Sequence, residues 1–349
     1  MILAMNMQNK KSQYRSGFTI VELIVVIVVI GILAGIAIVS YGAWKTSANA
    51  SQLKSDLNGV VAAMNSARSF NNTYPTAVPS SFVPSNGVTI SGGGNISGNG
   101  FCVTATNGTQ SYNISQFGLP FVGSCPVLYY DAGVGASYPG SGTTWTDLSG
   151  NGNTGTFNGG VAYNSANGGI LNFDGTSGYV SFPNDIVATS YIRTNGVTYS
   201  AWVKSTNTAS EQRIIGQKPS IGYSDLASGG LGISGGKAEM IAYDDGISYK
   251  YSVGGTALQN NTWYYIVGTY DPTDKNIRIY VNGVLDGTPV AIATFDRLTA
   301  NAENLIGALH TTSTESFIGS ISSAAIYNKA LSAAEIQQNF NALRSRYGI

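Results

Sequence analysis

The stretch that decides the organisation of this chain is GFTIVELIVVIVVIGILAGIAIV, residues 17–39. Residues 23–39 carry no polar side chain, and Glu22 is the single charge between Phe18 and Trp44. A helix over residues 18–44 would be about 40 Å long, and the hydrocarbon core of a bilayer is about 30 Å thick. We therefore predict a membrane-spanning helix over residues 18–44.

The flanks of this stretch set its orientation. Residues 1–17 contain Lys10, Lys11 and Arg15 and no acid, so the N-terminus is expected in the cytoplasm and the remainder of the chain outside. A secretory signal would have a shorter apolar run followed by small residues, whereas here Gly17 precedes the run. The simplest alternative is an uncleaved anchor. A carboxylate in lipid costs about 2.5–3.5 kcal/mol, however, so Glu22 is expected to have a partner.

Residues 17–23 closely resemble the class III signal of type IV prepilins. In that family a membrane peptidase cuts after the glycine on the cytoplasmic side, and the new N-terminal Phe is methylated. The resemblance implies a cleaved leader at residues 1–17 and processing between Gly17 and Phe18. It also implies that Glu22 pairs with the α-amine of Phe18 in a neighbouring subunit.

The same resemblance implies partners and a location. The partners are other pilin subunits, the prepilin peptidase, the inner-membrane pilus assembly machinery, and membrane lipid before assembly. The precursor is expected in the bacterial inner membrane, and the mature chain in an extracellular pilus or at the cell surface.

Residues 45–70 continue the helix with an amphipathic pattern. Its apolar face carries Leu53, Leu57, Val60, Met64 and Ala67, which recur at steps of four and three. Residues 71–126 then predict a small sheet with strands at Val88–Ile90, Phe101–Thr106 and Gln110–Ser115, the last two joined at Asn107-Gly108. A helix stripe over such strands resembles the α+β pilin domain, here residues 18–126.

The only cysteines, Cys102 and Cys125, lie in this predicted extracytoplasmic sheet. Disulfides persist outside the cytoplasm, and many pilins close their C-terminal region with one, so we interpret the pair as a structural disulfide. It would close a 24-residue loop, worth about 3 kcal/mol. A redox or metal pair is disfavoured, because there is no CxxC spacing and no neighbouring His.

Residues 127–349 predict an all-β sandwich, because short strands recur between turn signals. The predicted strands are Gly169–Phe173, Tyr179–Phe182, Val197–Val203, Arg213–Gln217, Ala238–Tyr243, Trp263–Tyr270, Asn276–Val281 and Phe317–Tyr327. Asn282-Gly283 predicts a hairpin turn. Ser332 and Glu335 form a capping-box pattern, so the chain is expected to end in a helix.

This second part resembles LamG-like, concanavalin A-like jelly rolls. The resemblance is carried by residues 147–153, 173–175, 199–203, 263–271, 279–283, 317–321 and 326–332. It implies two antiparallel sheets packed face to face over residues 127–349, with Trp202 and Trp263 in the core. The expected fold class is therefore multidomain: a long transmembrane and amphipathic helix with a small α+β pilin domain, followed by an all-β sandwich.

Composition and motifs exclude several functions. A formal net charge of zero with no basic block argues against nucleic acid as a partner. The Glu-x-Asp-x-x-Glu motif of the fold's glycosidases is absent, and Glu211, Glu239, Glu303 and Glu315 are scattered along the sequence. His310 has no Ser or Cys nucleophile at a suitable spacing. We therefore expect a protein that is not an enzyme.

The sequence also contains residues that are typical of a calcium site. Asp147, Ser149, Asn151 and Gly152 match the start of an EF-hand loop, but Asn158 stands where the final Glu would be. Some LamG-like domains hold calcium at a loop edge. The residues for such a site here are Asp147 and Asp174, with Asp244 and Asp245 behind them. The alternative is that these residues only form turns. No cofactor is certain.

Tyrosines are the remaining candidates for recognition. Tyr223, Tyr243, Tyr249 and Tyr251 flank Gly- and Asp-rich loops, and are expected to be half-buried strand residues rather than a sugar site.

The expected function joins the two parts of the chain. It is a minor, tip or decorating subunit of a type IV pilus that displays a LamG-like domain for adhesion to glycan or protein ligands. The alternatives are a pseudopilin-like component of a type II secretion system and a surface carbohydrate-active enzyme.

Overall fold

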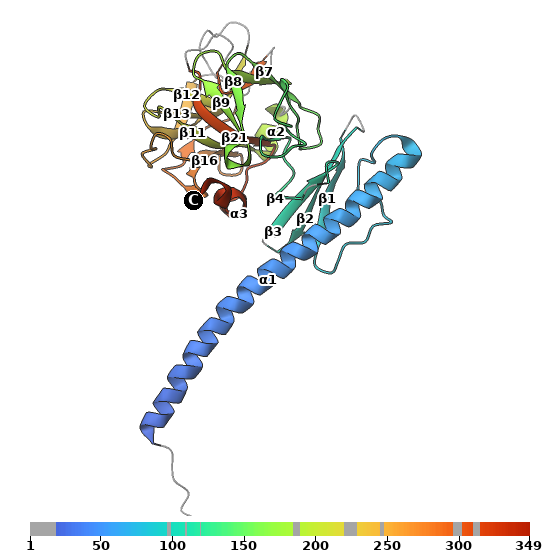
Figure 1. The fold of residues 1–349 in the computed structure, drawn as a ribbon, viewed down its shortest axis with the longest axis vertical. Helices are drawn as coiled ribbons and strands as arrows, with labels where there is room; N and C mark the ends of the chain where they lie inside the picture. The colour runs from blue at the N-terminus through green and yellow to red at the C-terminus, as the bar shows by residue number, and fades with distance from the viewer. Residues whose placement is uncertain are drawn as a thin grey trace, which may run out of the picture. The chain divides into compact units, whose positions relative to one another are not determined.

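The structure, a computed structural model, shows helices and strands over most of the chain (Figure 1). It describes residues 19–95, 99–108, 110–118, 120–183, 189–219, 229–244, 248–295, 302–309 and 315–349. The chain divides into two compact units, Met1–Asn49 and Ala50–Ile349.

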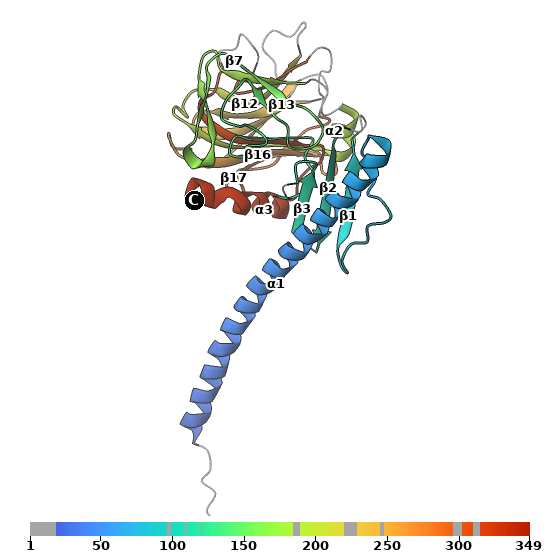
Figure 2. The same cartoon turned by 45° about the vertical axis from the view of Figure 1, so that its right-hand side comes forward.

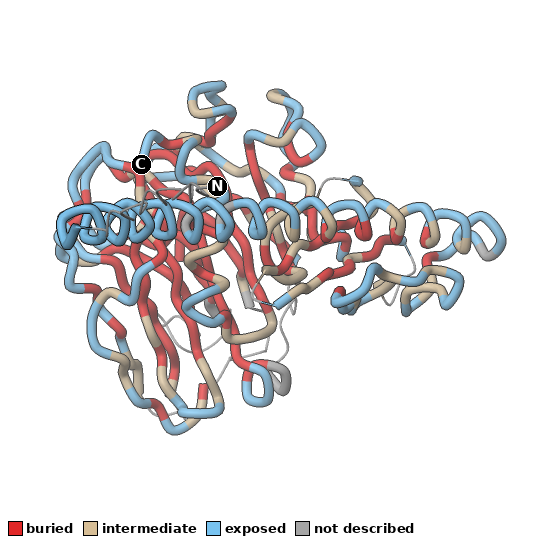
Figure 3. Tube along the Cα trace, turned by 90° about the horizontal axis from the view of Figure 1, so that it is seen from below, coloured by how far each residue is buried: buried red, intermediate tan, exposed pale blue. Residues whose placement is uncertain are grey.

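Helix α1, Ile20–Asn71, begins as the apolar stretch predicts. Every described side chain from Ile20 to Ala48 is exposed, as the pale blue part of α1 in Figure 3 shows. Among the described residues, α1 is the one helix long and apolar enough to cross a membrane. The predicted spanning segment is therefore confirmed as an apolar helix.

From Ala50 onward α1 is amphipathic and covers a small antiparallel sheet (Figure 2). The strand order is β1 (Thr89–Gly94), β2 (Phe101–Asn107), β3 (Gln110–Ser115) and β4 (Phe121–Val122). Leu53, Leu57, Val60 and Met64 are fully buried against Phe101, Val103, Ala105 and Ile114. The predicted stripe is therefore the side of α1 that packs on the sheet, and β2 and β3 pair as expected. The expected turn at Asn107-Gly108 is wrong by one residue, because Asn107 still belongs to β2 and pairs with Gln110.

Two further sheets form the sandwich. The eight-stranded sheet has the order β15 (Ser248–Val253), β14 (Lys237–Asp244), β13 (Gly229–Ser234), β12 (Gln212–Pro219), β20 (Ala302–Ile306), β10 (Tyr179–Phe182), β7 (Gly155–Asn158) and β6 (Thr144–Trp145).

The nine-stranded sheet has the order β18 (Val284–Leu285), β17 (Asn276–Val281), β16 (Tyr264–Asp271), β11 (Val197–Ser205), β21 (Ile318–Tyr327), β9 (Ile170–Asp174) and β8 (Val161–Asn164). In addition, β19 (Val290–Ala291) pairs with β17, and β5 (Leu128–Asp131) pairs with β21. The helical elements of this part are η1 (Ala166–Gly168), α2 (Thr189–Asn195), α3 (Ala333–Leu343) and η2 (Arg344–Tyr347).

The main core lies between the two sheets. The central strands β11, β16 and β21 are buried over nearly their whole length, and long stretches of the strands are red in Figure 3. A second apolar cluster lies where α3 and η2 cover the outside of the nine-stranded sheet. There the ring of Trp202 is stacked with Tyr347 at 4.1 Å and with Phe340 at 5.7 Å, measured between centroids. Trp202 and Trp263 are thus both buried, as expected. The predicted fold class is confirmed.

One hairpin shows how the sequence sets the register. Asn282 and Gly283 separate the paired residues Val281 and Val284, and both have positive φ, 51° and 83°. A two-residue turn with both φ values positive matches the twist of the flanking strands, and Asn and Gly tolerate this conformation best.

Candidate functional site

At the N-terminus of α1, Glu22 has partners within its own chain. Its Oε2 accepts hydrogen bonds from the backbone N–H and the hydroxyl of Thr19, both at 2.8 Å. The Glu22 N–H donates to Thr19 Oγ1 at 3.3 Å, which completes a capping box. Gly17 and Phe18 lie outside the described residues. The processing site and the pairing of Glu22 with a neighbour's amine therefore stay predictions.

The predicted disulfide is present. Cys102 on β2 is bonded to Cys125, with their Cα atoms 5.9 Å apart. The Cys125 N–H donates to Thr104 Oγ1 at 3.0 Å, and the side-chain amide of Asn113 donates to the carbonyls of Gly123 and Ser124 at 3.2 Å each. Residues 123–125 are therefore held to both β2 and β3.

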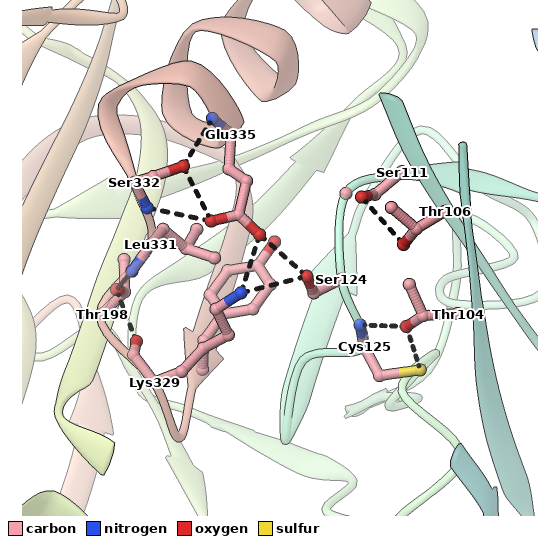
Figure 4. A network of polar contacts seen from close by, with 12 residues as sticks. Thr104, Thr106, Ser111, Ser124, Cys125, Thr198, Lys329, Leu331, Ser332 and Glu335 are labelled. Atoms are coloured by element: carbon pink, nitrogen blue, oxygen red, sulfur yellow. Dashed lines mark hydrogen bonds and ion pairs between the residues drawn. The ribbon is translucent and has the colours of Figure 1, made fainter. Parts of the chain in front are cut away.

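Helix α3 is joined to the same segment by a polar network, drawn in Figure 4. The Ser124 hydroxyl donates to Glu335 Oε1 at 2.9 Å, and Lys329 forms an ion pair with the same oxygen at 2.7 Å. Gln338 Nε2 donates to the Ser111 carbonyl at 2.9 Å. We call these contacts the joint, because they fix the end of the sandwich to the small sheet.

Glu335 also caps α3, since its Oε2 accepts from the backbone and hydroxyl of Ser332 at 2.9 and 3.0 Å. Burial alone would raise the pKa of Glu335, but Lys329 and the Ser332 N–H together hold it below its usual range. The carboxylate is therefore ionised at neutral pH.

Asp147, the first predicted calcium ligand, is buried and serves the backbone around it. Its Oδ1 accepts from the N–H groups of Tyr129 and Ser149, and its Oδ2 from the Ser149 hydroxyl and the Asn153 N–H, at 2.7–3.0 Å. Burial raises the pKa of Asp147, an effect that these donors oppose. Both carboxylate oxygens of Asp147 therefore accept hydrogen bonds that hold the surrounding backbone in place.

Asp174, the second predicted ligand, shows the same behaviour at an exposed turn. It accepts from the N–H groups of Thr176, Ser177 and Gly178 and from the Ser177 hydroxyl, at 2.6–2.9 Å. Burial alone would raise the pKa of this carboxyl, but the four donors together hold it well below its usual range. These contacts are those of a turn-forming Asp.

Of the two remaining acids of the predicted site, Asp244 and Asp245, only Asp244 lies among the described residues. Asp244 accepts from the N–H groups of Ala293 and Thr294 at 2.7 and 3.1 Å, and Asp245 lies outside the described residues, as do His310 and Tyr223. Across the described ranges, no group of three His, Cys, Asp or Glu side chains is arranged to hold a metal ion. The calcium site stays a prediction that these contacts do not favour.

Three tyrosines form a row on the outer face of the eight-stranded sheet. On β14 and β15, Tyr243 pairs with Tyr249 and Ile241 pairs with Tyr251, while Met240 and Ala242 face the core. Residues opposite one another in an antiparallel pair share a face. The ring centroids of Tyr243 and Tyr249 are 4.9 Å apart, and those of Tyr249 and Tyr251 6.4 Å apart.

Exposure rises along this row toward the edge of the sheet. Tyr243 is buried, Tyr249 is half-buried, and Tyr251 on the edge strand is 47% exposed. Tyr251 therefore differs from the half-buried side chain expected from the sequence, because no further strand covers β15 among the described residues. We call these three residues the tyrosine row.

Beside the row lies an ion cluster centred on Arg213, whose side chain is 5% exposed. The guanidinium pairs with Glu239, with Glu211 at 2.8 Å and with Glu315 at 2.7 Å. Burial raises the pKa of Glu239, an effect that the guanidinium opposes, and burial also raises the pKa of Tyr251. These three glutamates are scattered along the sequence, but the structure brings them together. They meet because the start of β12, strand β14 and the segment before β21 lie side by side at Arg213.

A glycine makes the cluster possible. Gly232 on β13 lies between Arg213 and Glu239 in the register of the sheet. A Cβ atom at residue 232 would lie 2.8 Å from Arg213 Nη1. A side chain at residue 232 would crowd the guanidinium where it crosses β13 to reach the carboxylate.

The sequence contained one signal for this cluster. Arg213 stands before an apolar pair in a strand, and an Arg buried in a sheet is almost always paired with carboxylates. The sequence did not say which carboxylates these would be.

Two family models match the chain. One, described as the prokaryotic N-terminal methylation motif, matches residues 12–38. The other, described as the concanavalin A-like lectin/glucanases superfamily, matches residues 174–337. The chain thus carries a methylation motif of the pilin type and a concanavalin A-like domain. The search of the curated proteins gave no match.

Several solved structures are similar to the sandwich. Domain 4 of AbnA, an extracellular GH43 arabinanase from Geobacillus stearothermophilus, in complex with arabinotriose, is 16% identical with a TM-score of 0.48, over 62% of this chain and 98% of that one. The receptor binding domain of the botulinum neurotoxin C/D mosaic serotype is 18% identical with a TM-score of 0.47, over 62% and 51%. The chain spans about half the length of the toxin domains it matches. Likenesses of this size say nothing of function.

Proposed function

We propose that the chain is a pilin-type subunit that assembles through α1 and displays a glycan-binding sandwich outside the cell. The methylation motif at residues 12–38 supports the first part of this proposal, and the lectin-like family match at residues 174–337 supports the second. In the proposed division, residues 1–17 are the leader, 18–126 the pilin-type domain and 127–349 the sandwich.

The observation that carries the binding function is the tyrosine row beside the Arg213 cluster. Ligand sites combine an apolar, usually aromatic, surface with a few fixed polar groups. The exposed ring of Tyr251 offers a flat face to a sugar ring, and the hydroxyl at its end offers a hydrogen bond. The carboxylates of Glu211 and Glu315 stand near it as acceptors for sugar hydroxyls, held in place by Arg213.

The cluster favours binding over hydrolysis. A glycosidase needs one carboxyl that can donate a proton and a second that attacks or activates water. Glu211, Glu239 and Glu315 all form ion pairs with the guanidinium of Arg213, which engages their oxygens and opposes the rise that burial causes in the pKa of Glu239. We propose that they orient a ligand, and the surface carbohydrate-active enzyme is kept as the alternative that the experiment tests.

The test is a glycan binding screen with the purified full chain in detergent. Tyr251→Ala is expected to weaken binding of the best glycan about tenfold, because stacking on one ring contributes on the order of 1 kcal/mol. The control is Val284→Ala, which shortens an exposed side chain on β18 of the other sheet, away from the proposed site. Equal loss in the two variants, or binding unchanged in both, would place the ligand elsewhere.

The same samples separate binding from catalysis and test the calcium site. Release of reducing ends from the bound glycan, abolished in Glu239→Gln, would replace the binding proposal with the enzyme alternative. Binding that needs Ca²⁺, and that in Asp174→Asn is lost or needs much more Ca²⁺, would establish the predicted metal site. Equal glycan binding with Ca²⁺ and with a chelator would contradict the predicted metal site.

The pilin part is tested in cells. Replacing Gly17 with Val should leave a membrane-bound precursor that keeps its leader, detected as a slower band and by mass spectrometry. Incorporation of that uncleaved chain into surface filaments would contradict the proposal. A cleaved chain that is found only in a periplasmic secretion apparatus would favour the pseudopilin alternative.

A further inference from the structure

The surface beside the tyrosine row carries more carboxylates than cations. Arg213 pairs there with the carboxylates of Glu211, Glu239 and Glu315. Burial raises the pKa of Glu239, but even a neutral Glu239 would leave two carboxylates for one guanidinium. The described side chains of this surface therefore carry an excess of negative charge.

The guanidinium itself is closed to a ligand. The side chain of Arg213 is 5% exposed, and each of its three nitrogens is directed at a different carboxylate: Nη1 at Glu239, Nη2 at Glu211 and Nε at Glu315. An acidic group on a glycan would meet these glutamates without gaining a cationic donor, and an anion that loses hydration without a partner is costly. The surface therefore disfavours anionic glycans.

Two lysines on the neighbouring strands do not change this balance at Tyr251. Successive side chains of a strand point to opposite faces, so Lys250 lies on the other face of β15 from Tyr251. Lys237 shares a face of β14 with Glu239, but it is four residues, or about 13 Å, along the strand from Ile241, the partner of Tyr251. Glu239 is only two residues from Ile241, so a carboxylate is the nearer charge.

Two side chains at this surface are open to a ligand. Tyr251 is 47% exposed, and the side chain of Glu211 is 50% exposed. Arg213 Nη2 donates to Oε1 of Glu211 at 2.8 Å, and no other partner of Glu211 is found among the described residues. The second oxygen of Glu211 is therefore open to accept a hydrogen bond from a ligand.

The register of the sheet brings these two side chains to one place. Glu239 pairs with Val253, so Tyr251 is a diagonal neighbour of Glu239 on the same face, about 7–8 Å away. Glu211 and Glu239 both contact the guanidinium of Arg213. Burial is the main cause that raises the pKa of Tyr251, and the charges of Glu239 and Glu211 raise it further, which agrees with their closeness to the phenol.

An ammonium group on a sugar fits this arrangement. An ammonium donates a charge-assisted hydrogen bond to a carboxylate, and it is also attracted to the face of an aromatic ring. The apolar face of the sugar ring can lie on Tyr251 and on Val253, which is 42% exposed. N-acetylation turns the ammonium into a neutral amide and would remove both charged contacts.

We propose that this site binds glycans that contain a free amino sugar, in preference to neutral and anionic glycans. Glu211 accepts a hydrogen bond from the ammonium, and the ring of Tyr251 lies beside it. This inference rests on the proposed function, because it names the class of glycan that the tyrosine row would bind.

The experiment compares three oligosaccharides of equal length by calorimetry, with the full chain in detergent. They are a glucosamine oligomer, the same oligomer with every amine acetylated, and an oligogalacturonate, at a pH at which the free amines are protonated. The glucosamine oligomer should bind about tenfold more tightly than its acetylated form, the combined effect of one exposed ion pair and one contact between a cation and a ring. The oligogalacturonate should bind most weakly.

Glu211→Gln should reduce the tenfold preference to about twofold or less, while Arg213 keeps its two other carboxylates. The matched control is Asp274→Asn. Asp274 is also paired with an arginine, Arg278, and its side chain is 44% exposed, but it lies between β16 and β17 of the other sheet. This control removes the same charge and should keep the full preference. Thermal midpoints establish that both variants are folded.

Several outcomes would overturn the inference. These are equal affinity for the two glucosamine oligomers, a preference that survives in Glu211→Gln, and binding of none of the three oligosaccharides. Competition by oligolysine as strong as that of the glucosamine oligomer would also overturn it, because charge alone would then be recognised. Binding of the acetylated oligomer that is lost in Tyr251→Ala would support the proposed function even where the amine preference fails.

Discussion

The N-terminal and C-terminal halves of α1 share one secondary structure and have opposite surroundings. Along residues 20–48 the large apolar side chains are exposed, with Ile27 at 59%. Along residues 50–71, Leu53, Leu57, Val60 and Met64 lie on one face and are covered by the small sheet, with Leu57 at 0%, while Phe70 near the end of the helix is exposed. Among the described residues of its compact unit, no segment covers the first half, whereas the small sheet of the same chain covers the second half.

The comparison shows which half of α1 needs other molecules to cover its apolar surface. A helix that is apolar all around requires lipid or other helices, whereas an amphipathic helix needs only one covered face. Stability of the C-terminal half is therefore a property of this chain. Stability of the N-terminal half is a property of the membrane or of an assembly.

The largest effect is expected at Glu22, where the N-terminal half has its one charge. Glu22→Gln keeps a side chain that can complete the capping box but removes the charge. If Glu22 pairs with a neighbouring subunit's amine, incorporation into sheared surface filaments should fall at least tenfold while membrane insertion is retained. The measurement is an immunoblot of filament and membrane fractions.

The control for this variant is Thr19→Ala, which removes the intrachain partner of Glu22 and leaves the charge. It should retain assembly. Normal filament incorporation by Glu22→Gln would show that the capping box alone is the role of this carboxylate.

A substitution in each half tests the comparison directly. Leu57→Ala leaves a void under the sheet and should lower its free energy of unfolding by about 2–5 kcal/mol. Ile27→Ala removes similar apolar volume from an exposed position and should change that free energy by less than about 0.5 kcal/mol. The readout is hydrogen exchange of the β2 and β3 amides in urea. Equal losses would mean that the two halves are not independent.

The disulfide should stabilise only the covered half. Replacing Cys102 and Cys125 with Ser removes a cross-link between residues 23 apart and should cost about 3 kcal/mol in the unfolding of the small sheet. Urea titrations with and without reductant measure this, and the doubly substituted chain should no longer respond to reductant. A loss of helix in residues 20–48 on reduction would contradict the separation.

The smallest effect is expected at the joint. The pKa of Glu335 is lowered in the folded chain, so its contribution is fully present above its unfolded pKa of about 4.5 and is lost as the pH falls through the lower folded value. The protection of amides in α3 and in residues 123–125, taken relative to exchange in an unstructured chain at the same pH, should fall below about pH 4. Glu335→Gln should remove most of this pH dependence, whereas an unchanged profile would assign it to other carboxyls.

Local patterns predicted much of the fold. The stripe beginning at Leu53 and the turn at Asn282-Gly283 gave the packed side of α1 and one hairpin, because periodicity and turn chemistry are properties of neighbouring residues. Each of the eight strands expected in the sandwich is present. Strand β13 was missed because its sequence, Gly-Gly-Leu-Gly-Ile-Ser, has the composition of a loop. Helix α2 carried no capping signal.

The sites were harder to predict because they depend on contacts between distant segments. Glu211, Glu239 and Glu315 are distant from one another in sequence. They meet at Arg213 because the segments that carry them, before β12, on β14 and before β21, are neighbours in the structure. Arg346 in η2 reaches Asp131 on β5 at 2.7 Å, a pairing that no spacing could suggest. Glu22 shows the reverse case. Its intrachain partner, Thr19, was three residues away and was overlooked in favour of a neighbouring subunit.

The position of α3 after all the strands of the small sheet and of the sandwich has a consequence for biosynthesis. Chains are made from the N-terminus, so the small sheet emerges long before Glu335 and Gln338, which hold it to the sandwich. The sheet must therefore rely on α1 and its disulfide while the sandwich is still being made. A chain that stops between β21 and α3 would keep every strand of the small sheet and of the sandwich and would lose Glu335 and Gln338, so termination there would remove this connection and leave the strands of both folds in place.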